Sequence, residues 1–452
     1  MPQSDRTMDM TQGPLLKKIL LFSLPLMVTN LLQMLFNAAD VIVVGQFAGF
    51  TSLAAVGSTG PIIYLCTNLL IGFSVGVNVL VANYVGAGNK ERNIFLTLHT
   101  AVTVGLLGGI ILGAVGFLAV PLILTAMSTP SDVYGKTLLY LRIYFLGTPF
   151  VLLYNYGTAV LRAIGDTKRP MIFLLISGIT NLVLNLFTVI SLGWDVAGVG
   201  TATVVSQALS AVLVLACLSR EKGPWQYRWR CLLLDRKTLW DLARIGIPAG
   251  LQSCMFSISN VVIQGAINSY GSVVMAANSA GNNIGNFLYI AMNSFHQAAL
   301  TFISQNRGAQ KWDRIKKVAV TCLVCVGILG TVAAVVINMF AGNLISIFNG
   351  DSRVVEAGVQ QIHWNITLYA VFGLADVLVG CIRGFGITLA PMIINLLGTC
   401  AFRVLWILWI QVPSVPVTYV YASYPMSWTV ILVILAGYWK YLYGHFAKRH
   451  GL

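Results

Sequence analysis

Charged residues are scarce in this sequence of 452 residues. Asp, Glu, Lys and Arg together make up 9% of it, and only 14 residues are acidic, whereas a soluble domain carries roughly a quarter charged residues. Hydrophobic residues make up 57%, and the mean hydropathy is +0.81. The shortage of charge excludes a soluble globular protein and predicts an integral membrane protein.

The apolar stretches also lack the two-residue alternation of a membrane β-barrel strand. They are long and continuous, and about 20 apolar residues span a bilayer as a helix. The polar N-terminus, residues 1–13, has no cleavable signal pattern, so the first span is expected to stay in the mature protein. We predict an all-α membrane protein with twelve transmembrane helices, near residues 15–45, 53–83, 93–120, 133–158, 168–190, 196–219, 239–268, 273–303, 315–346, 357–382, 388–411 and 415–444.

Cysteine and histidine offer no obvious metal centre. The eight cysteines lie mostly in apolar segments, and the C-x-x-C pair Cys322 and Cys325 has no second pair and no nearby His. His296 and His363 have no Cys or Asp at ligand spacing. We therefore predict no metal site. We also predict no enzyme and no catalytic residues, because these histidines lack a nucleophile–base arrangement.

A twelve-residue motif occurs twice. Residues 161–172 return as residues 382–393, 221 positions later, with Arg, Gly, Thr, Pro, Met and Ile in register. Three matches in order at one offset argue against chance. The same offset, within two residues, relates Gly86-Ala87 to Gly308-Ala309 and Pro25 to Pro248.

An offset near half the chain length predicts two homologous halves, as in transporters built around a pathway between two lobes. Six spans fall in each half, so both halves insert in the same orientation and their pseudo-twofold axis runs along the membrane normal. We expect an N-terminal six-helix lobe at 1–219, a cytoplasmic connecting loop at 220–238 and a C-terminal six-helix lobe at 239–452.

The formal net charge of +14 follows the expected topology. Of the 28 Lys and Arg residues, 24 fall in the N-terminus, the loops after even-numbered spans and the C-terminus. This bias places both termini in the cytoplasm. It accounts for the basic charge without a nucleic-acid partner.

Two of the fourteen acidic residues, Asp40 and Asp376, fall inside predicted spans. A charged side chain at mid-membrane costs roughly 2.5–3.5 kcal/mol on insertion scales, so it is rare and usually functional. A static hydrogen bond between helices remains the alternative for each carboxylate.

Asp40 belongs to a polar stripe. Asn30, Gln33, Asn37 and Asp40 fall within an arc of about 80° on one helix. Such a stripe must face protein or water, because lipid offers no hydrogen bonds.

Three further polar residues are expected near Asp40. Asn181 and Asn185 lie four residues apart in the fifth span, Thr203 lies in the sixth, and all are counted to the outer half of the bilayer. A carboxylate beside amide and hydroxyl oxygens can hold a proton or a Na⁺ ion.

The two halves do not repeat this chemistry. Asp376 corresponds to Asn155 in the first half, and Asp40 corresponds to Ile263, beside Gln264. The eighth span is rich in amides, which suit either a permissive ligand wall or contacts between helices. The residues expected along a substrate pathway are Gln33, Asn155, Gln264, Asn282, Asn286 and Asp376.

Over essentially its whole length, the chain resembles the multidrug and toxic compound extrusion (MATE) transporters. The resemblance implies a V-shaped pair of six-helix lobes and export of cationic amphipathic compounds in exchange for H⁺ or Na⁺. The pattern is closer to the DinF-like bacterial branch than to the NorM branch. The motifs that carry it are the stripe from Pro25 to Asp40, Gly86-Ala87-Gly88-Asn89, Leu161 to Thr167, Asn181 to Asn185, and Val196-Ala197-Gly198.

Within the family, Asp40 resembles the acidic coupling residue, with Asn181, Thr203 and Tyr140 as its partners; Asn37 is the further candidate on the stripe. Two departures from the family pattern matter. Phe256 occupies the place of a Glu found in members with a Na⁺ site in the C-terminal lobe. Many members also carry Asp in place of Asn185. These absences favour H⁺ over Na⁺ as the coupling ion.

The resemblance further implies a monomer in the bacterial inner (plasma) membrane, in contact with lipids and driven by an ion gradient without a cofactor. The alternative is a lipid-linked oligosaccharide flippase of the same superfamily. A flippase predicts a strongly cationic lumen and extra spans, whereas only Arg403 lies deep inside a span here. Arg403 is expected either to pair with Asp376 or to extend towards the membrane surface.

Overall fold

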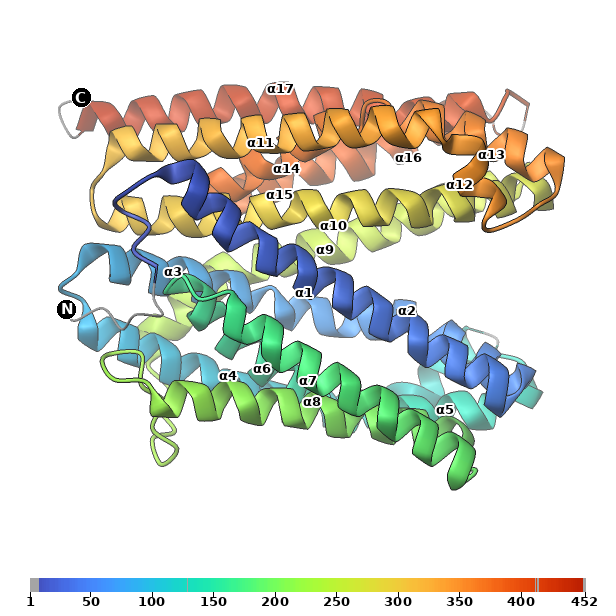
Figure 1. The fold of residues 1–452 in the computed structure, drawn as a ribbon, viewed down its shortest axis with the longest axis horizontal. Helices are drawn as coiled ribbons and strands as arrows, with labels where there is room; N and C mark the ends of the chain where they lie inside the picture. The colour runs from blue at the N-terminus through green and yellow to red at the C-terminus, as the bar shows by residue number, and fades with distance from the viewer. Residues whose placement is uncertain (1–7, 128, 411, 413, 450–452) are drawn as a thin grey trace. The chain divides into compact units, whose positions relative to one another are not determined.

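The computed structural model describes residues 8–127, 129–410, 412 and 414–449 (Figure 1). These residues are almost entirely helical and include no strand, which confirms the predicted all-α class. In the first half the helices are α1 (Leu15–Val43), α2 (Phe50–Ile71), α3 (Phe73–Ala87), α4 (Glu91–Ala126), α5 (Ser131–Leu146), α6 (Thr148–Ala163), α7 (Lys168–Leu186) and α8 (Asp195–Arg220), with short π-helices η1 (Val44–Ala48) and η2 (Phe187–Ser191).

The second half repeats this order with a few differences. Its helices are α9 (Arg236–Asn268), α10 (Ser272–Gly308), α11 (Trp312–Met339), α12 (Ala341–Ser346), α13 (Ser352–Asn365), α14 (Tyr369–Gly384), α15 (Leu389–Asn395), α16 (Phe402–Trp409) and α17 (Thr418–Arg449), with the π-helix η3 (Leu396–Ala401) between α15 and α16.

The helices coincide with the predicted spans. Within the described residues, nine helical segments are long and apolar enough to cross a membrane, or up to eleven if each bent pair is one span. The bent pairs are α5 with α6, at 44°, and α13 with α14, at 45°. The remaining predicted span, near 273–303, falls on the 37-residue α10, whose amide side chains reduce its hydropathy.

The internal repeat is visible in the helix boundaries. Helices α6 and α14 both have 16 residues and begin at 148 and 369, which are 221 positions apart. Helices α4 and α11 begin at 91 and 312, again 221 apart. The repeat read from the motifs therefore extends to whole helices.

The chain divides into two compact units. One unit consists of Met1–Asp9 and Leu24–Gly250, and the other of Met10–Ser23 and Leu251–Leu452. The division falls inside α1 and α9, within two residues of Pro25 and Pro248. Each of these helices therefore contributes to both units.

The segment 220–238 packs on the first unit. The backbone N–H of Arg228 donates to Nε2 of His99 over 3.1 Å, and that of Asp235 donates to Oγ1 of Thr100 over 3.2 Å. Asp235 also accepts from the backbone N–H and the hydroxyl of Thr238, which lowers the pKa of its carboxyl group. These bonds fix the start of α9 against α4.

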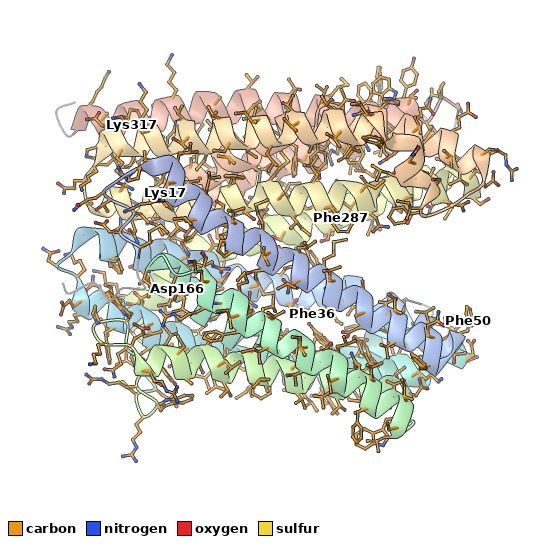
Figure 2. The ribbon with its side chains drawn as sticks, in the orientation of Figure 1. Lys17, Phe36, Phe50, Asp166, Phe287 and Lys317 are labelled. Atoms are coloured by element: carbon orange, nitrogen blue, oxygen red, sulfur yellow. The ribbon has the colours of Figure 1, made fainter. Side chains whose placement is uncertain are left out.

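Glycine allows α1 to approach α7 closely in the first unit. A Cβ atom added to Gly178 would lie 1.8 Å from the ring of Phe36, which Figure 2 labels on α1. Only a residue without a side chain fits here. The contact brings the next turn of α1, which carries Asp40, beside the following turn of α7.

Charged side chains lie at one end of each unit. Figure 2 places Asp166 and Phe50 at opposite ends of the first unit, and it places Lys17 and Lys317 at the same end of the second. At the Asp166 end, Arg169 forms ion pairs with both Asp166 and Glu221. The basic loops predicted from the sequence are thus ordered at helix ends.

Candidate functional site

Asp40, Asn185 and Asn181 form a hydrogen-bonded chain in the first unit. Nδ2 of Asn185 donates to Oδ1 of Asp40 over 2.5 Å and to Oδ1 of Asn181 over 3.2 Å. Asn185 is fully buried and Asn181 is 6% exposed, while Asp40 is partly buried. The i, i+4 spacing of the two asparagines places both amides on the face of α7 that meets α1.

The chain offers several oxygen atoms to a small cation. Oδ1 of Asn185 is buried and has no partner among the described residues. Together with the Asp40 carboxylate and Oδ1 of Asn181, it provides acceptors suited to a proton or a hard cation. The arrangement can therefore exchange one positive charge for another.

The other residues expected at this site take different positions. Tyr140 is buried in an apolar cluster with Val43 and Val199, close enough to Asp40 for their charges to interact. The hydroxyl of Thr203 donates to the carbonyl of Val199 in its own helix over 2.9 Å. Asn37 is exposed on α1, as is Gln33.

Each π-helix adjoins a polar residue of interest. Helix η1 begins four residues after Asp40, η2 begins two residues after Asn185, and η3 ends two residues before Arg403. A π-segment changes the i→i−4 hydrogen-bond register and is common at functional sites. In this protein all three lie next to polar side chains inside apolar helices.

Asp376 lies in the second unit and forms a pair with His296. Nδ1 of His296 lies 3.1 Å from Oδ1 of Asp376 and 2.8 Å from its backbone oxygen. Asn293 donates to Oδ2 over 3.4 Å. At the equivalent place in the first unit, Asn155 donates to Val151 of its own helix over 2.8 Å.

The sequence left open whether Arg403 pairs with Asp376. No ion pair among the described residues joins them, since Asp376 contacts His296. Arg403 is 3% exposed, so it does not extend to the surface either. Its Nε donates to Oγ of Ser427 over 2.9 Å.

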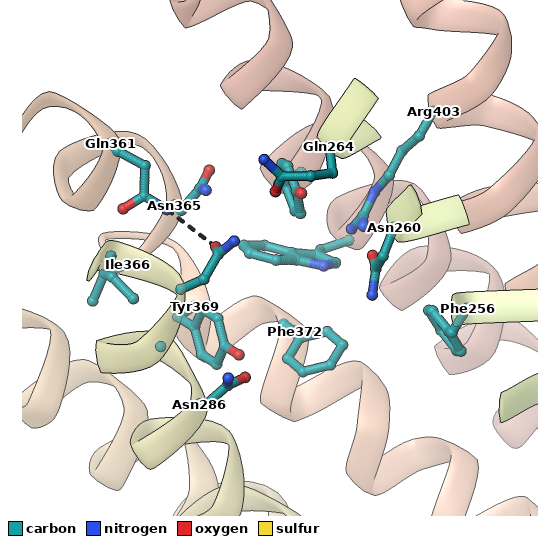
Figure 3. Close-up of a pocket in the computed structure, with 15 residues that line it drawn as sticks. Phe256, Asn260, Gln264, Asn286, Gln361, Asn365, Ile366, Tyr369, Phe372 and Arg403 are labelled. Atoms are coloured by element: carbon teal, nitrogen blue, oxygen red, sulfur yellow. Dashed lines mark hydrogen bonds between the residues drawn. The ribbon is translucent and has the colours of Figure 1, made fainter. Parts of the chain in front are cut away.

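A cavity of about 330 Å³ lies inside the second unit (Figure 3). Three residues expected along a substrate pathway, Gln264, Asn282 and Asn286, line it. Asp376 is absent from the lining, and Gln33 and Asn155 belong to the first unit. Phe256 is also in the cavity wall.

Sequence reasoning missed several residues of this cavity. Gln361 and Asn365 are buried, and each has a side-chain oxygen without a partner among the described residues. The i, i+4 spacing of Gln361 and Asn365 at the end of α13 is the sequence signal that could have indicated a polar face there. Asn260 and the aromatic residues Tyr369, Phe372, Tyr424 and Trp428 complete the wall.

Across the described part of the chain, no group of three or more His, Cys, Asp or Glu side chains is placed to hold a metal ion. The cysteines of the C-x-x-C pair are free thiols in α11. The polar site of the first unit combines amides with the Asp40 carboxylate, and the cavity of the second unit combines amides with the Arg403 guanidinium.

Comparison with known proteins gives one family throughout. A family model described as MatE matches residues 25–187 and 248–408, one match in each half. The probable multidrug resistance protein YoeA of Bacillus subtilis (strain 168) is 28% identical over 433 residues, covering 94% of this chain and 93% of that protein. The probable multidrug resistance protein NorM of Thermotoga maritima is 25% identical over 404 residues, covering 86% and 84%.

Solved structures share the fold. The crystal structure of a MATE protein in the bent conformation superposes with a TM-score of 0.91 at 19% identity, covering 98% of both chains. At that identity the likeness establishes the architecture alone.

Proposed function

Because the chain belongs to the MatE family, whose members are membrane transporters and not enzymes, we propose that it exports small cationic amphipathic compounds in exchange for H⁺ by alternating access. The names of its bacterial relatives support drug export. The hydrogen-bonded chain of Asp40, Asn185 and Asn181 is the observation that carries the coupling step.

In this proposal Asp40 exchanges a proton for the substrate's positive charge. The ionised carboxylate accepts from Asn185 and favours a cation nearby. Protonation removes that charge and turns one carboxyl oxygen into a donor, which has to find an acceptor among the Asn181 and Asn185 oxygens. Proton and cationic substrate then lower each other's affinity, as thermodynamic linkage requires of an antiporter.

The choice of H⁺ over Na⁺ rests on the number of ligands. A Na⁺ ion needs several oxygen atoms; in the first unit the Asp40 carboxylate and two amides supply them, so the difference lies in the second unit. In the second unit Phe256 stands where the family resemblance leads us to expect Glu in members with a Na⁺ site, and Nδ1 of His296 lies 3.1 Å from the Asp376 carboxylate. A proton needs only Asp40 itself.

We further propose a plasma-membrane location with both termini in the cytoplasm. The support is the concentration of Lys and Arg in alternate loops, and Figure 2 shows Lys17 and Lys317 at one end of the second unit. We expect the protein to act as a monomer among membrane lipids.

The test is efflux of ethidium in inverted membrane vesicles, with ΔpH and Na⁺ gradients imposed separately. We expect dye movement with ΔpH alone and none with a Na⁺ gradient at symmetrical pH. Efflux that persists on a Na⁺ gradient after ΔpH is collapsed would overturn the ion assignment. Absence of movement under either gradient would overturn dye export itself.

A further inference from the structure

The cavity of the second unit contains a buried cation without an acidic partner. Arg403 is 3% exposed, and none of the ion pairs among the described residues includes it. Its guanidinium carbon lies 4.2 Å from the ring centre of Tyr424 and 5.8 Å from that of Trp428. A buried charge inside a membrane span is costly unless a counter-charge or hydrogen-bond acceptors meet it.

The unused donors of Arg403 are available to the cavity. Among the described residues, Nε is the one nitrogen of Arg403 with a hydrogen bond, to Ser427, and protein atoms do not fully enclose the two terminal nitrogens. Arg403 is also the sole charged residue in the cavity wall within the described chain. The electrostatic character of the cavity is therefore positive.

The opposite end of the cavity is polar but uncharged. Figure 3 shows Gln361 and Asn365 on the far side from Arg403, with Tyr369 and Phe372 lining the space between. Gln361 and Asn365 are 1% and 5% exposed, so protein atoms largely enclose their amides. This end of the cavity wall therefore adds polarity without a charge that would repel an anion.

We propose that this cavity binds a planar organic anion, with its carboxylate or other oxyanion held by Arg403. The guanidinium fork matches an oxyanion in geometry as well as in charge. The flat body of the ligand packs against the aromatic side chains that line the cavity. A cation without an acidic group is repelled by Arg403 and binds elsewhere.

This inference rests on the proposed function and deepens it, since it assigns a second substrate class to a transporter. The site differs in charge from the Asp40 site of the first unit. At the repeat offset of 221, Arg403 corresponds to Leu182, so the positive charge is specific to the second half. The first-unit site therefore contains an acidic residue and the second-unit cavity a basic one.

The experiment compares three ligands with one ring system. Isothermal titration calorimetry on the purified full-length protein in dodecyl maltoside uses 2-naphthoate, neutral 2-naphthamide and 2-naphthylmethylammonium. We expect 2-naphthoate to bind about 10-fold or more tightly than the amide, as a hydrogen bond to a charged group allows. The ammonium binds outside this cavity, so Arg403→Gln should leave its affinity unchanged. Equal binding of 2-naphthoate and 2-naphthamide by the wild-type protein would overturn the proposal.

Variants locate the site. Arg403→Gln should abolish the preference for 2-naphthoate, and Arg403→Lys should keep part of it. The control is Arg353→Gln, because Arg353 is an exposed residue paired with Asp351 outside the cavity. A folded Arg403→Gln protein that keeps the full preference would contradict the assignment.

If Arg403→Gln fails to fold, the ligand series on the wild-type protein still decides, because it needs no substitution. Ethidium efflux without binding of 2-naphthoate would sink this inference and leave the proposed function standing. Binding of 2-naphthoate without any ethidium efflux would support this inference and contradict the proposed function.

Discussion

Asp40 and Arg403 show how the environment of a charged residue determines what it can do in a membrane. Asp40 has an amide donor at 2.5 Å, so its negative charge has a partner whenever it is ionised. Arg403 has one hydrogen bond and aromatic neighbours but no carboxylate among the described residues. We interpret Asp40 as a residue that binds and releases a proton, and Arg403 as a residue that binds an anion.

We expect transport to depend on Asn185, because its amide donates a hydrogen bond to Asp40. Replacing it with Leu removes the donor to Asp40, and hydrogen bonds to charged groups contribute about 1.5–3 kcal/mol. We expect ΔpH-driven efflux by Asn185→Leu to fall about 10-fold or more. The control is Thr180→Val on the same helix, whose hydroxyl is exposed and bonds only its own turn. Unchanged efflux by Asn185→Leu would mean that Asp40 acts without it.

The residues of the first-unit site were accessible to sequence reasoning because helix periodicity and rarity are local properties. Asp40, Asn181 and Asn185 are polar residues at helical spacing in apolar runs. The partner of Asp376 was not accessible in this way. His296 is 80 positions away on another helix, and only packing brings the two together.

At the scale of the helix, close packing positions the first-unit site. Gly178 lets α7 contact Phe36 of α1; Asp40 and Asn181 follow about one turn later on their helices, and Asn185 about two turns later. The π-helices η1 and η2 then follow Asp40 and Asn185. Sequence patterns did not predict the π-helices, because the change from i→i−4 to wider hydrogen bonding alters no hydrophobic period.

Gly178→Ala should destabilise the protein by about 1–3 kcal/mol, because the added methyl group would overlap the ring of Phe36. Thermal unfolding of the purified protein measures this loss. Phe36→Leu combined with Gly178→Ala should recover part of it. Gly57→Ala is the control, since an added Cβ there meets nothing within 4 Å. Equal stability of Gly178→Ala and Gly57→Ala would show that α1 and α7 are not in close contact.

At the scale of the whole molecule, the two halves share helices but differ in chemistry. The repeat, the helical class and the places of the apolar helices followed from composition and motif spacing. The cavity of the second unit did not, because its lining comes from separate helices, including α9, α10, α13 and α14. The sequence also could not indicate that the division between units falls inside α1 and α9.

That division predicts a role for Pro25 and Pro248, which lie beside it. Proline in a helix interior removes a hydrogen bond and eases bending. We expect Pro25→Ala and Pro248→Ala to keep or raise thermal stability, because Ala is the better helix former by about 3 kcal/mol, and to slow efflux. Pro121→Ala in α4, a proline within one unit, is the control. If both changes leave efflux intact, the kinks are static.

The central claim is that Asp40 couples transport to the proton gradient. Asp40→Asn keeps the shape of the side chain and removes its titration. In inverted vesicles with ΔpH imposed, we predict that this variant reaches the membrane in normal amount and exports no ethidium, while Asp351→Asn, at an exposed helix start, exports it at the wild-type rate. Wild-type efflux by Asp40→Asn would contradict the account and leave Asp40 a structural residue.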